Sequence, residues 1–264
     1  MDFNPDKFTC YDDTDNDCLT VFEVQAVLEA FKTKLNAGRP LNLLSIDSCM
    51  PGSIEAVYQF SQCAEVMESS PQTTLIGGVP YKDILTQVAA NTTINAEQFG
   101  EIIAKGYVAH ANSMANRGEV AGVFRPAMSQ KFVATLDILS VELLKAWQTG
   151  NKTGFKNLIT YGEDKRYWDL GIFLNSIVNG NTDLSALSNA SAIKQAAQDA
   201  LDELKKAHVT TWYSGTYADR KVSGLSIAWP IKDEYVQWQK FYKALAFAKG
   251  THWDEFMEAF FGLK

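Results

Sequence analysis

The stretch PLNLLSIDSCMPGSIEAVYQF, residues 40–60, joins a short apolar run to a helical pattern. Leu41–Ile46 is apolar and follows a proline, which is typical of a fully buried strand in a parallel sheet. Apolar residues then recur at helical spacing over Ser53–Cys63, and a capped helical pattern over Thr20–Asn36 precedes the strand. Helix, strand and helix in this order predict a layered α/β fold.

The rest of the chain reads as further elements of the same fold. The first 18 residues read as an acidic loop. Strands are expected at 66–69, 209–217 and 224–230, a long helix within 124–155, and further helices within 81–108, 166–179, 190–207 and 235–261. Because no repeat or long linker interrupts this order, we expect one domain in three portions. These are an α/β core over 1–110, a mainly helical portion over 111–208, and returning strands with closing helices over 209–264.

Composition narrows the class of protein. The 264 residues are 46% hydrophobic and 12% aromatic, which predicts a large ordered core. The net charge of -7 argues against nucleic acid as a partner, because a phosphate backbone attracts clustered Lys and Arg. No apolar run approaches the roughly 18 residues of a membrane span. The first residues also lack the basic start and apolar centre of a signal peptide.

The four cysteines lie in the first quarter of the chain, at Cys10, Cys18, Cys49 and Cys63. Cys10 and Cys18 could pair in an exported protein, whereas Cys63 reads as a core residue. Cys49 follows a strand, where ligands of open α/β sheets bind. A helix start nearby favours its thiolate, and the carboxylate of Asp47 opposes it. From these residues alone, Cys49 is either a buried structural thiol or a nucleophile.

Several segments, in one order, resemble the clostripain family of cysteine peptidases. IDSCMPGSIEAVYQF is similar to the family's nucleophile segment, in which an apolar strand precedes Asp-x-Cys and a later Glu and Tyr. Those positions are Asp47, Cys49, Glu55 and Tyr58. The resemblance extends over nearly the whole chain through CYDDTDNDCLTVFEVQAVL, SSPQTTLIGGVPYKDIL, YWDLGIFL, GLSIAWP and YKALAFAKGTHWDEF.

This resemblance implies a caspase-like three-layer α/β/α sandwich with additional C-terminal helices. It also implies an endopeptidase with a Cys-His dyad that cleaves peptide or protein substrates after Arg or Lys. Cys49 would be the nucleophile, and its N–H would form part of the oxyanion hole. Asp47 and Ser70 would bind substrate. A carboxylate at the base of the pocket suits a basic side chain, since Arg can bind it through two hydrogen bonds.

The general base of the family lies in a His-Gly motif upstream of the segments that match. His110, His208 and His252 lie in other patterns, and we interpret them as surface or core residues. The resemblance therefore implies a heavy chain that a light chain from the same precursor completes, inactive alone, and secreted or at the cell envelope. A non-catalytic caspase-like scaffold that binds peptides or partners is the alternative, which the missing His and Pro51 support.

The acidic stretch Asp13–Asp17 is similar to the first half of a calcium-binding loop. Cys18 and Val24 stand where that loop requires Gly and a bidentate Glu. No metal ligand is assigned, and the dyad chemistry requires no cofactor. Calcium stays open because members of the family depend on it.

Overall fold

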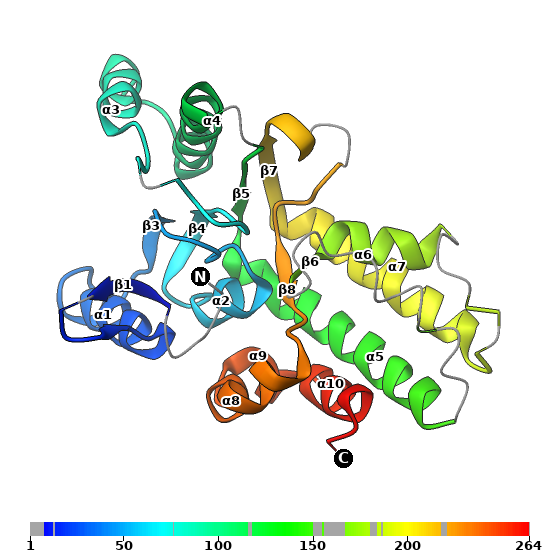
Figure 1. Cartoon of the computed structure of the whole chain (residues 1–264). Coiled ribbons are helices and arrows are strands. Elements are labelled where there is room, and N and C mark those ends of the chain that lie inside the picture. Colours follow the sequence, from blue (N-terminus) through cyan, green and yellow to red (C-terminus); the bar gives the residue numbers. More distant parts are fainter. Residues whose placement is uncertain are drawn as a thin grey trace.

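The computed structural model describes residues 8–12, 14–75, 77–115, 118–149, 155, 167–179, 184–185, 187–217 and 221–263 (Figure 1). Its central sheet has the strand order β3-β4-β5-β7, with β3 (Leu41–Ile46), β4 (Ala64–Ser69), β5 (Val120–Phe124) and β7 (His208–Tyr213). β3 and β4 are parallel, whereas β5 is antiparallel to both of its neighbours. The expectation of a parallel sheet therefore holds for the first pair only, and the sheet is mixed.

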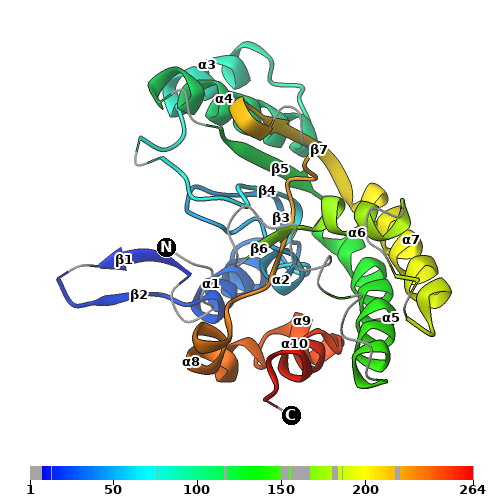
Figure 2. The same ribbon diagram turned by 45° about the vertical axis from the view of Figure 1, so that its right-hand side comes forward.

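Helices cover both faces of this sheet (Figure 2). α4 (Ala96–Ala115) packs on one face, with α3 (Tyr81–Ala90) beside it, and α2 (Ile54–Gln59) and α5 (Ser129–Gln148) lie on the other. Alternate residues of β4 serve the two layers: Val66 belongs to the cluster under α4, and Met67 to the larger core that contains α5. The predicted three-layer α/β/α architecture is confirmed.

The remaining elements extend the α5 side of the molecule. α6 (Leu170–Val178) and α7 (Ala190–Ala207) pack together, and α7 also packs on α5. β6 (Tyr167–Asp169) and β8 (Ser226–Ala228) form a separate two-stranded antiparallel sheet. The chain closes with α8 (Lys232–Tyr242), α9 (Ala246–Gly250) and α10 (Trp253–Phe261), where buried aromatic rings gather. Trp168 stacks on Trp229 at 4.4 Å between ring centroids, which ties the small sheet into this aromatic core.

α1 (Val21–Lys34) begins as predicted, with a capping box in which the Thr20 hydroxyl accepts from the Glu23 N–H. The segment before it was wrongly expected to be a loop. It contains an antiparallel hairpin of β1 (Thr9–Asp12) and β2 (Asp17–Leu19). The acidic residues hid this hairpin because they lack the apolar alternation of a half-buried strand.

Three further expectations about strands are corrected by the structure. The predicted long helix from Phe124 is wrong at its start, because Phe124 ends β5 and α5 begins only at Ser129 after a 3₁₀ turn, Pro126–Met128. The helix expected from about residue 166 is preceded by β6. β3 is half-buried rather than fully buried, since Asn42 and Ser45 are exposed. Runs as short as VAGVF fit a strand and a buried helix turn equally well.

Candidate active site

The predicted site residues lie just beyond the carboxyl ends of two parallel strands. Ile46, the last residue of β3, pairs in register with Ser69, the last residue of β4. Asp47 and Cys49 follow the first strand, and Ser70 follows the second. The parallel pairing therefore brings all three residues to one edge of the sheet.

The turn that carries Cys49 is bound to the segment after β4. Met50 adopts a left-handed conformation with φ 66°, and its N–H donates to the carbonyl of Gln72 at 2.9 Å. The Gly52 N–H donates to the Ser70 carbonyl, also at 2.9 Å. A Cβ on Gly52 would lie 2.6 Å from the Pro71 nitrogen, so only glycine allows this approach. Two backbone hydrogen bonds and one close contact thus fix the turn.

Cys49 presents its thiol and its backbone N–H at this turn. Its side chain is half-buried against the larger core, and its Sγ accepts from the Thr74 N–H at 3.3 Å. The Thr74 Oγ1 lies 3.5 Å from the same sulfur. In the part of the chain that the structure describes, the Cys49 N–H has no hydrogen-bond partner. A thiol beside an unoccupied N–H is the arrangement needed to attack a carbonyl and hold the resulting oxyanion.

Asp47 is exposed and is held by the loop that leads into α3. Its Oδ2 accepts from the Val79 N–H at 3.1 Å and from the Tyr81 hydroxyl at 2.9 Å. Gly78 is left-handed, and a Cβ there would lie 2.8 Å from that oxygen. The hydrogen bond to Asp47 raises the pKa of Tyr81. The carboxylate is therefore oriented before any ligand binds, with one oxygen already engaged.

A second carboxyl group, Glu68 of β4, lies near Asp47. Its Oε2 accepts from the Ser45 hydroxyl at 2.6 Å, and the side chain is only 4% exposed. Burial, with a smaller effect of the charge of Asp47, raises the pKa of Glu68 to about 7, although the hydrogen bond from Ser45 lowers it. Ser45 is the partner of Glu68 in the parallel pairing of β3 with β4, and Asp47 follows the end of β3 close enough for its charge to act on Glu68. Glu68 is not among the site residues predicted from the sequence, although a carboxyl group within the otherwise uncharged end of β4 was a signal for it.

Ser70 lies at the site, but its side chain serves the turn. The hydroxyl accepts from the Gln72 N–H at 3.1 Å and donates to the Gln72 carbonyl at 3.3 Å. Ser70 is 4% exposed, so it is buried in the structure. Its role in binding substrate stays a prediction.

Glu55 joins the nucleophile turn to the other end of the chain. Its buried Oε1 accepts from the Ala228 N–H and from the Tyr242 hydroxyl, both at 2.9 Å. Burial raises the pKa of Glu55. Beside it, the Ser226 N–H donates to the Gly52 carbonyl at 2.9 Å. β8 and α8 thus hold the nucleophile turn and the start of α2 in place through hydrogen bonds to Gly52 and Glu55. Tyr58, the other residue of the family pattern, is half-buried on α2.

The three histidines of the chain have their described contacts elsewhere. The His208 ring bonds the Thr211 hydroxyl at 2.7 Å, and burial lowers its pKa. His252 Nδ1 lies 2.7 Å from the Asp137 carboxylate, which raises the pKa of His252. His110 lies on α4. Among the described residues, the side-chain contacts of Cys49 are with Thr74 and the core, and none is with a histidine.

Residues 14–16 of the acidic stretch lie between β1 and β2, Asp17 begins β2, and Asp13 lies outside the described residues. Within the described ranges, no three His, Cys, Asp or Glu side chains gather closely enough to hold a metal ion. Within the described residues, Cys10 and Cys18 are not joined by a disulfide. No helix in the described parts has the length and apolar character to cross a membrane.

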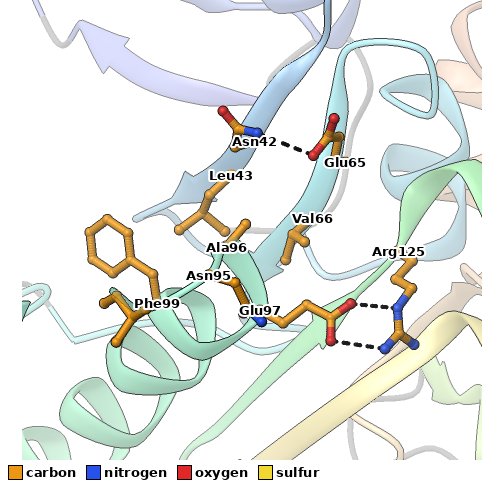
Figure 3. A pocket seen from close by; sticks show the side chains of 10 residues that line it. Asn42, Leu43, Glu65, Val66, Asn95, Ala96, Glu97, Phe99 and Arg125 are labelled. Carbon is orange, nitrogen blue, oxygen red and sulfur yellow. Dashed lines mark hydrogen bonds and ion pairs between the residues drawn. The ribbon is translucent and has the colours of Figure 1, made fainter. Parts of the chain in front are cut away.

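A separate pocket of about 770 Å³ lies at the opposite, amino ends of β3 and β4 (Figure 3). Asn42 and Leu43 of β3 line one side, and the start of α4 lines another. Glu97 and Arg125 form a two-pronged ion pair at its edge, with distances of 2.6 and 2.9 Å. Because Asp47 and Cys49 follow the carboxyl ends of the strands, this pocket is not part of the candidate active site.

Known proteins with related sequence or structure were compared with this architecture. The model of the Clostripain family matches residues 3–260. A cysteine protease from B. fragilis is 19% identical and has a TM-score of 0.60, over 93% of this chain and 99% of that chain. A secreted C11 cysteine protease from Bacteroides thetaiotaomicron, bound to an irreversible peptide inhibitor, is 17% identical with a TM-score of 0.61, over 96% of this chain and 68% of that chain.

A further structure, a clostripain from Bacteroides thetaiotaomicron in complex with the peptide inhibitor BTN-VLTK-AOMK, is 14% identical. Its TM-score is 0.57, over 92% of this chain and 98% of that chain. At these identities the structural likeness establishes the fold. A sequence comparison with curated proteins finds no match.

Proposed function

Because the chain belongs to the clostripain family of cysteine peptidases, we propose that it is the nucleophile-bearing heavy chain of an endopeptidase that cleaves after Arg or Lys. Cys49 attacks the scissile carbonyl, and its N–H stabilises the oxyanion. One observation carries this proposal. A half-buried thiol, an unoccupied N–H and a preoriented carboxylate lie together just beyond the carboxyl ends of β3 and β4.

Basic specificity is the electrostatic consequence of the Asp47 carboxylate, which lies two residues before the thiol of Cys49. One oxygen of Asp47 is used by Val79 and Tyr81, which leaves its other oxygen for a cation. An ammonium or guanidinium group gains a charge-assisted hydrogen bond there that a neutral side chain does not gain. The B. thetaiotaomicron clostripain was solved with an inhibitor whose peptide part ends in lysine, which supports the proposal by analogy.

The general base is proposed to come from a light chain that is encoded upstream and separated by self-cleavage. A Cys-His dyad needs a histidine within hydrogen-bond reach of the sulfur. The described contacts of Cys49 include none of the three histidines of the chain. The pairing of β3 also supports a missing light chain. Among the described strands β3 pairs only with β4, so its other side has no neighbouring strand. Residues of β3 also line the pocket of Figure 3. An added strand would satisfy those backbone groups.

The test restores the proposed complex. The chain is combined with the segment encoded upstream of Met1, and hydrolysis of reporter peptides ending in Arg, Lys or Ala is measured. We expect cleavage of the basic reporters, its loss in Cys49→Ala, and wild-type rates in the control Cys18→Ala. Asp47→Asn should lower kcat/KM for the Arg reporter by about a hundredfold and leave the Ala reporter unchanged.

The outcomes separate this proposal from the scaffold alternative. Hydrolysis that survives Cys49→Ala contradicts the assignment of the nucleophile. A folded complex that binds Arg peptides without cutting them, in every variant, favours a non-catalytic peptide-binding protein.

Secretion, or a place at the cell envelope, belongs to the same proposal. Two solved relatives are described as secreted proteases, and their chains resemble this one in fold. Fractionation of the source cells, with an antibody against the chain, tests it. Recovery from the cytoplasm alone contradicts it.

A further inference from the structure

Thr74 lies against the sulfur of Cys49 with three polar groups, of which the carbonyl is the most distant and accepts from the neutral thiol at 4.0 Å. Its N–H donates to the Sγ at 3.3 Å, and its hydroxyl oxygen lies 3.5 Å from the same atom. Thr74 is half-buried, so these groups are partly withdrawn from water. A sulfur that carries negative charge accepts hydrogen bonds more strongly than a neutral thiol does.

The segment that carries Thr74 is fixed independently of Cys49. The Ser70 and Gln72 carbonyls accept from the Gly52 and Met50 N–H groups, each at 2.9 Å. The Ser70 hydroxyl closes a local turn onto the Gln72 N–H at 3.1 Å. These bonds hold residues 70–72 beside the nucleophile turn, two residues before Thr74. The two groups of Thr74 are therefore in place before the thiol loses its proton, so little reorganisation is required.

We propose that Thr74 is a positioning residue of the peptidase, which orients the Cys49 sulfur and stabilises its thiolate. This inference rests on the proposed function. When the S–H proton passes to the general base, the new lone pair on sulfur accepts from the Thr74 N–H and hydroxyl.

The experiment measures the reactivity of the thiol itself and needs no light chain. The full chain is treated with iodoacetamide at pH 7, and mass spectrometry follows each cysteine separately. Thr74→Val keeps the size and the backbone N–H but removes the hydroxyl. We expect alkylation of Cys49 to slow about fivefold to tenfold, because a hydrogen bond to the charged form is lost. The exposed Cys10 on β1 is the internal reference and should not change.

Two further variants make the result decisive. Thr74→Ser restores a hydroxyl and should restore most of the rate. Thr86→Val removes a hydroxyl that bonds only the Lys82 carbonyl within α3, and it should leave Cys49 unchanged. An unchanged Cys49 rate in Thr74→Val overturns the proposal. A faster rate also overturns it, because Thr74 would then shield the thiol.

The reconstituted peptidase distinguishes the failure of this inference from the failure of the proposed function. There we expect Thr74→Val to lower kcat while KM stays near the wild-type value. If the complex cleaves nothing but the alkylation effect is present, the positioning role stands and the peptidase assignment fails. If the complex cleaves and neither alkylation nor kcat responds, the role of Thr74 is wrong. Should Thr74→Val unfold, shown by its thermal melt, Thr74→Ala takes its place, because it also keeps the backbone N–H and removes the hydroxyl; an unchanged Cys49 rate in Thr74→Ala then overturns the proposal.

Discussion

At the scale of single residues, Gly52 controls the geometry of the nucleophile turn. Its carbonyl and N–H bond to opposite neighbours, Ser226 and Ser70. The space where a side chain would lie is filled by backbone atoms of Ser70 and Pro71, the nearest at 2.6 Å. Backbone cannot move aside as the end of a flexible side chain can. Three segments therefore approach one another closely only because residue 52 is glycine. They are β8, the nucleophile turn and the segment after β4.

We expect Gly52→Ala to lower the free energy of unfolding by about 2 kcal/mol, the cost of overpacking a dense interior. It should also change the alkylation rate of Cys49, because the turn must shift. The matched control is Gly250→Ala, where the nearest atoms would be 3.8 Å from the new Cβ. Urea unfolding followed by circular dichroism measures both variants. Equal effects of the two substitutions would contradict the argument.

The residues of the site differ in how far the sequence could predict them. Asp47 and Cys49 end an apolar run, so their position at a strand end could be read directly. Thr74 could not be found in this way, because its contact with Cys49 spans 25 positions and depends on how a polar loop folds back. Glu68 was missed because β-strand alternation gives the face of a side chain only when the pairing register is known.

At the scale of elements, Glu55 connects α2 with β8 and α8. The two hydrogen bonds to its Oε1 come from residues 173 and 187 positions away. The Ala228 N–H and the Tyr242 hydroxyl are buried with it, so removing the carboxyl group leaves both donors without an acceptor. The raised pKa of Glu55 favours its neutral form in the fold.

Glu55→Ala should therefore cost about 3 kcal/mol in the free energy of unfolding, from two unsatisfied donors and a cavity. Glu55→Gln keeps a neutral acceptor of similar shape and should cost less than half as much. Tyr242→Phe removes one donor and should fall near the Gln variant. Thermal and urea unfolding of the three variants test this order. If Glu55→Ala and Glu55→Gln lower the free energy of unfolding equally, the hydrogen bonds of Glu55 do not stabilise the contact of α2 with β8 and α8.

The elements that the sequence failed to predict are short strands whose partners are distant. β5 has five residues, which pair with β7 along the strand and with β4 over Gly122–Phe124, so backbone groups that a helix would satisfy internally are satisfied by other strands. Nothing in the sequence VAGVF itself distinguishes a strand from a buried turn of helix. By contrast, α1 carries its own start signal in Thr20 and Glu23, and local contacts alone specify it.

At the scale of the whole molecule, buried carboxyl groups link the stability of the fold to pH. Burial raises the pKa of four of them, in different parts of the chain: Glu55, Glu68, Asp169 and Asp254. The half-buried His208 acts in the opposite sense, because its lowered pKa makes the fold less stable in acid. Since the carboxyl groups outnumber it, the folded chain should hold more protons than the unfolded chain between about pH 5 and 7.

Glu68 gives the sharpest form of this prediction. Its pKa is 4.5 when ordinary and about 7 in the fold, so between these values the folded state keeps a proton that the unfolded state has lost. Its contribution to the free energy of unfolding therefore falls as pH rises from 4.5 to about 7, by at most about 1.4 kcal/mol per pH unit.

Glu68→Gln removes this dependence of stability on pH. Urea unfolding at pH 5.5, 6.5 and 7.5 should show a stability that declines in the wild type and declines less steeply in the variant. Glu65→Gln is the control, because Glu65 lies on the same strand and is exposed. Identical slopes in wild type and Glu68→Gln would mean that Glu68 is charged in the fold, and that Ser45 and its surroundings stabilise the carboxylate.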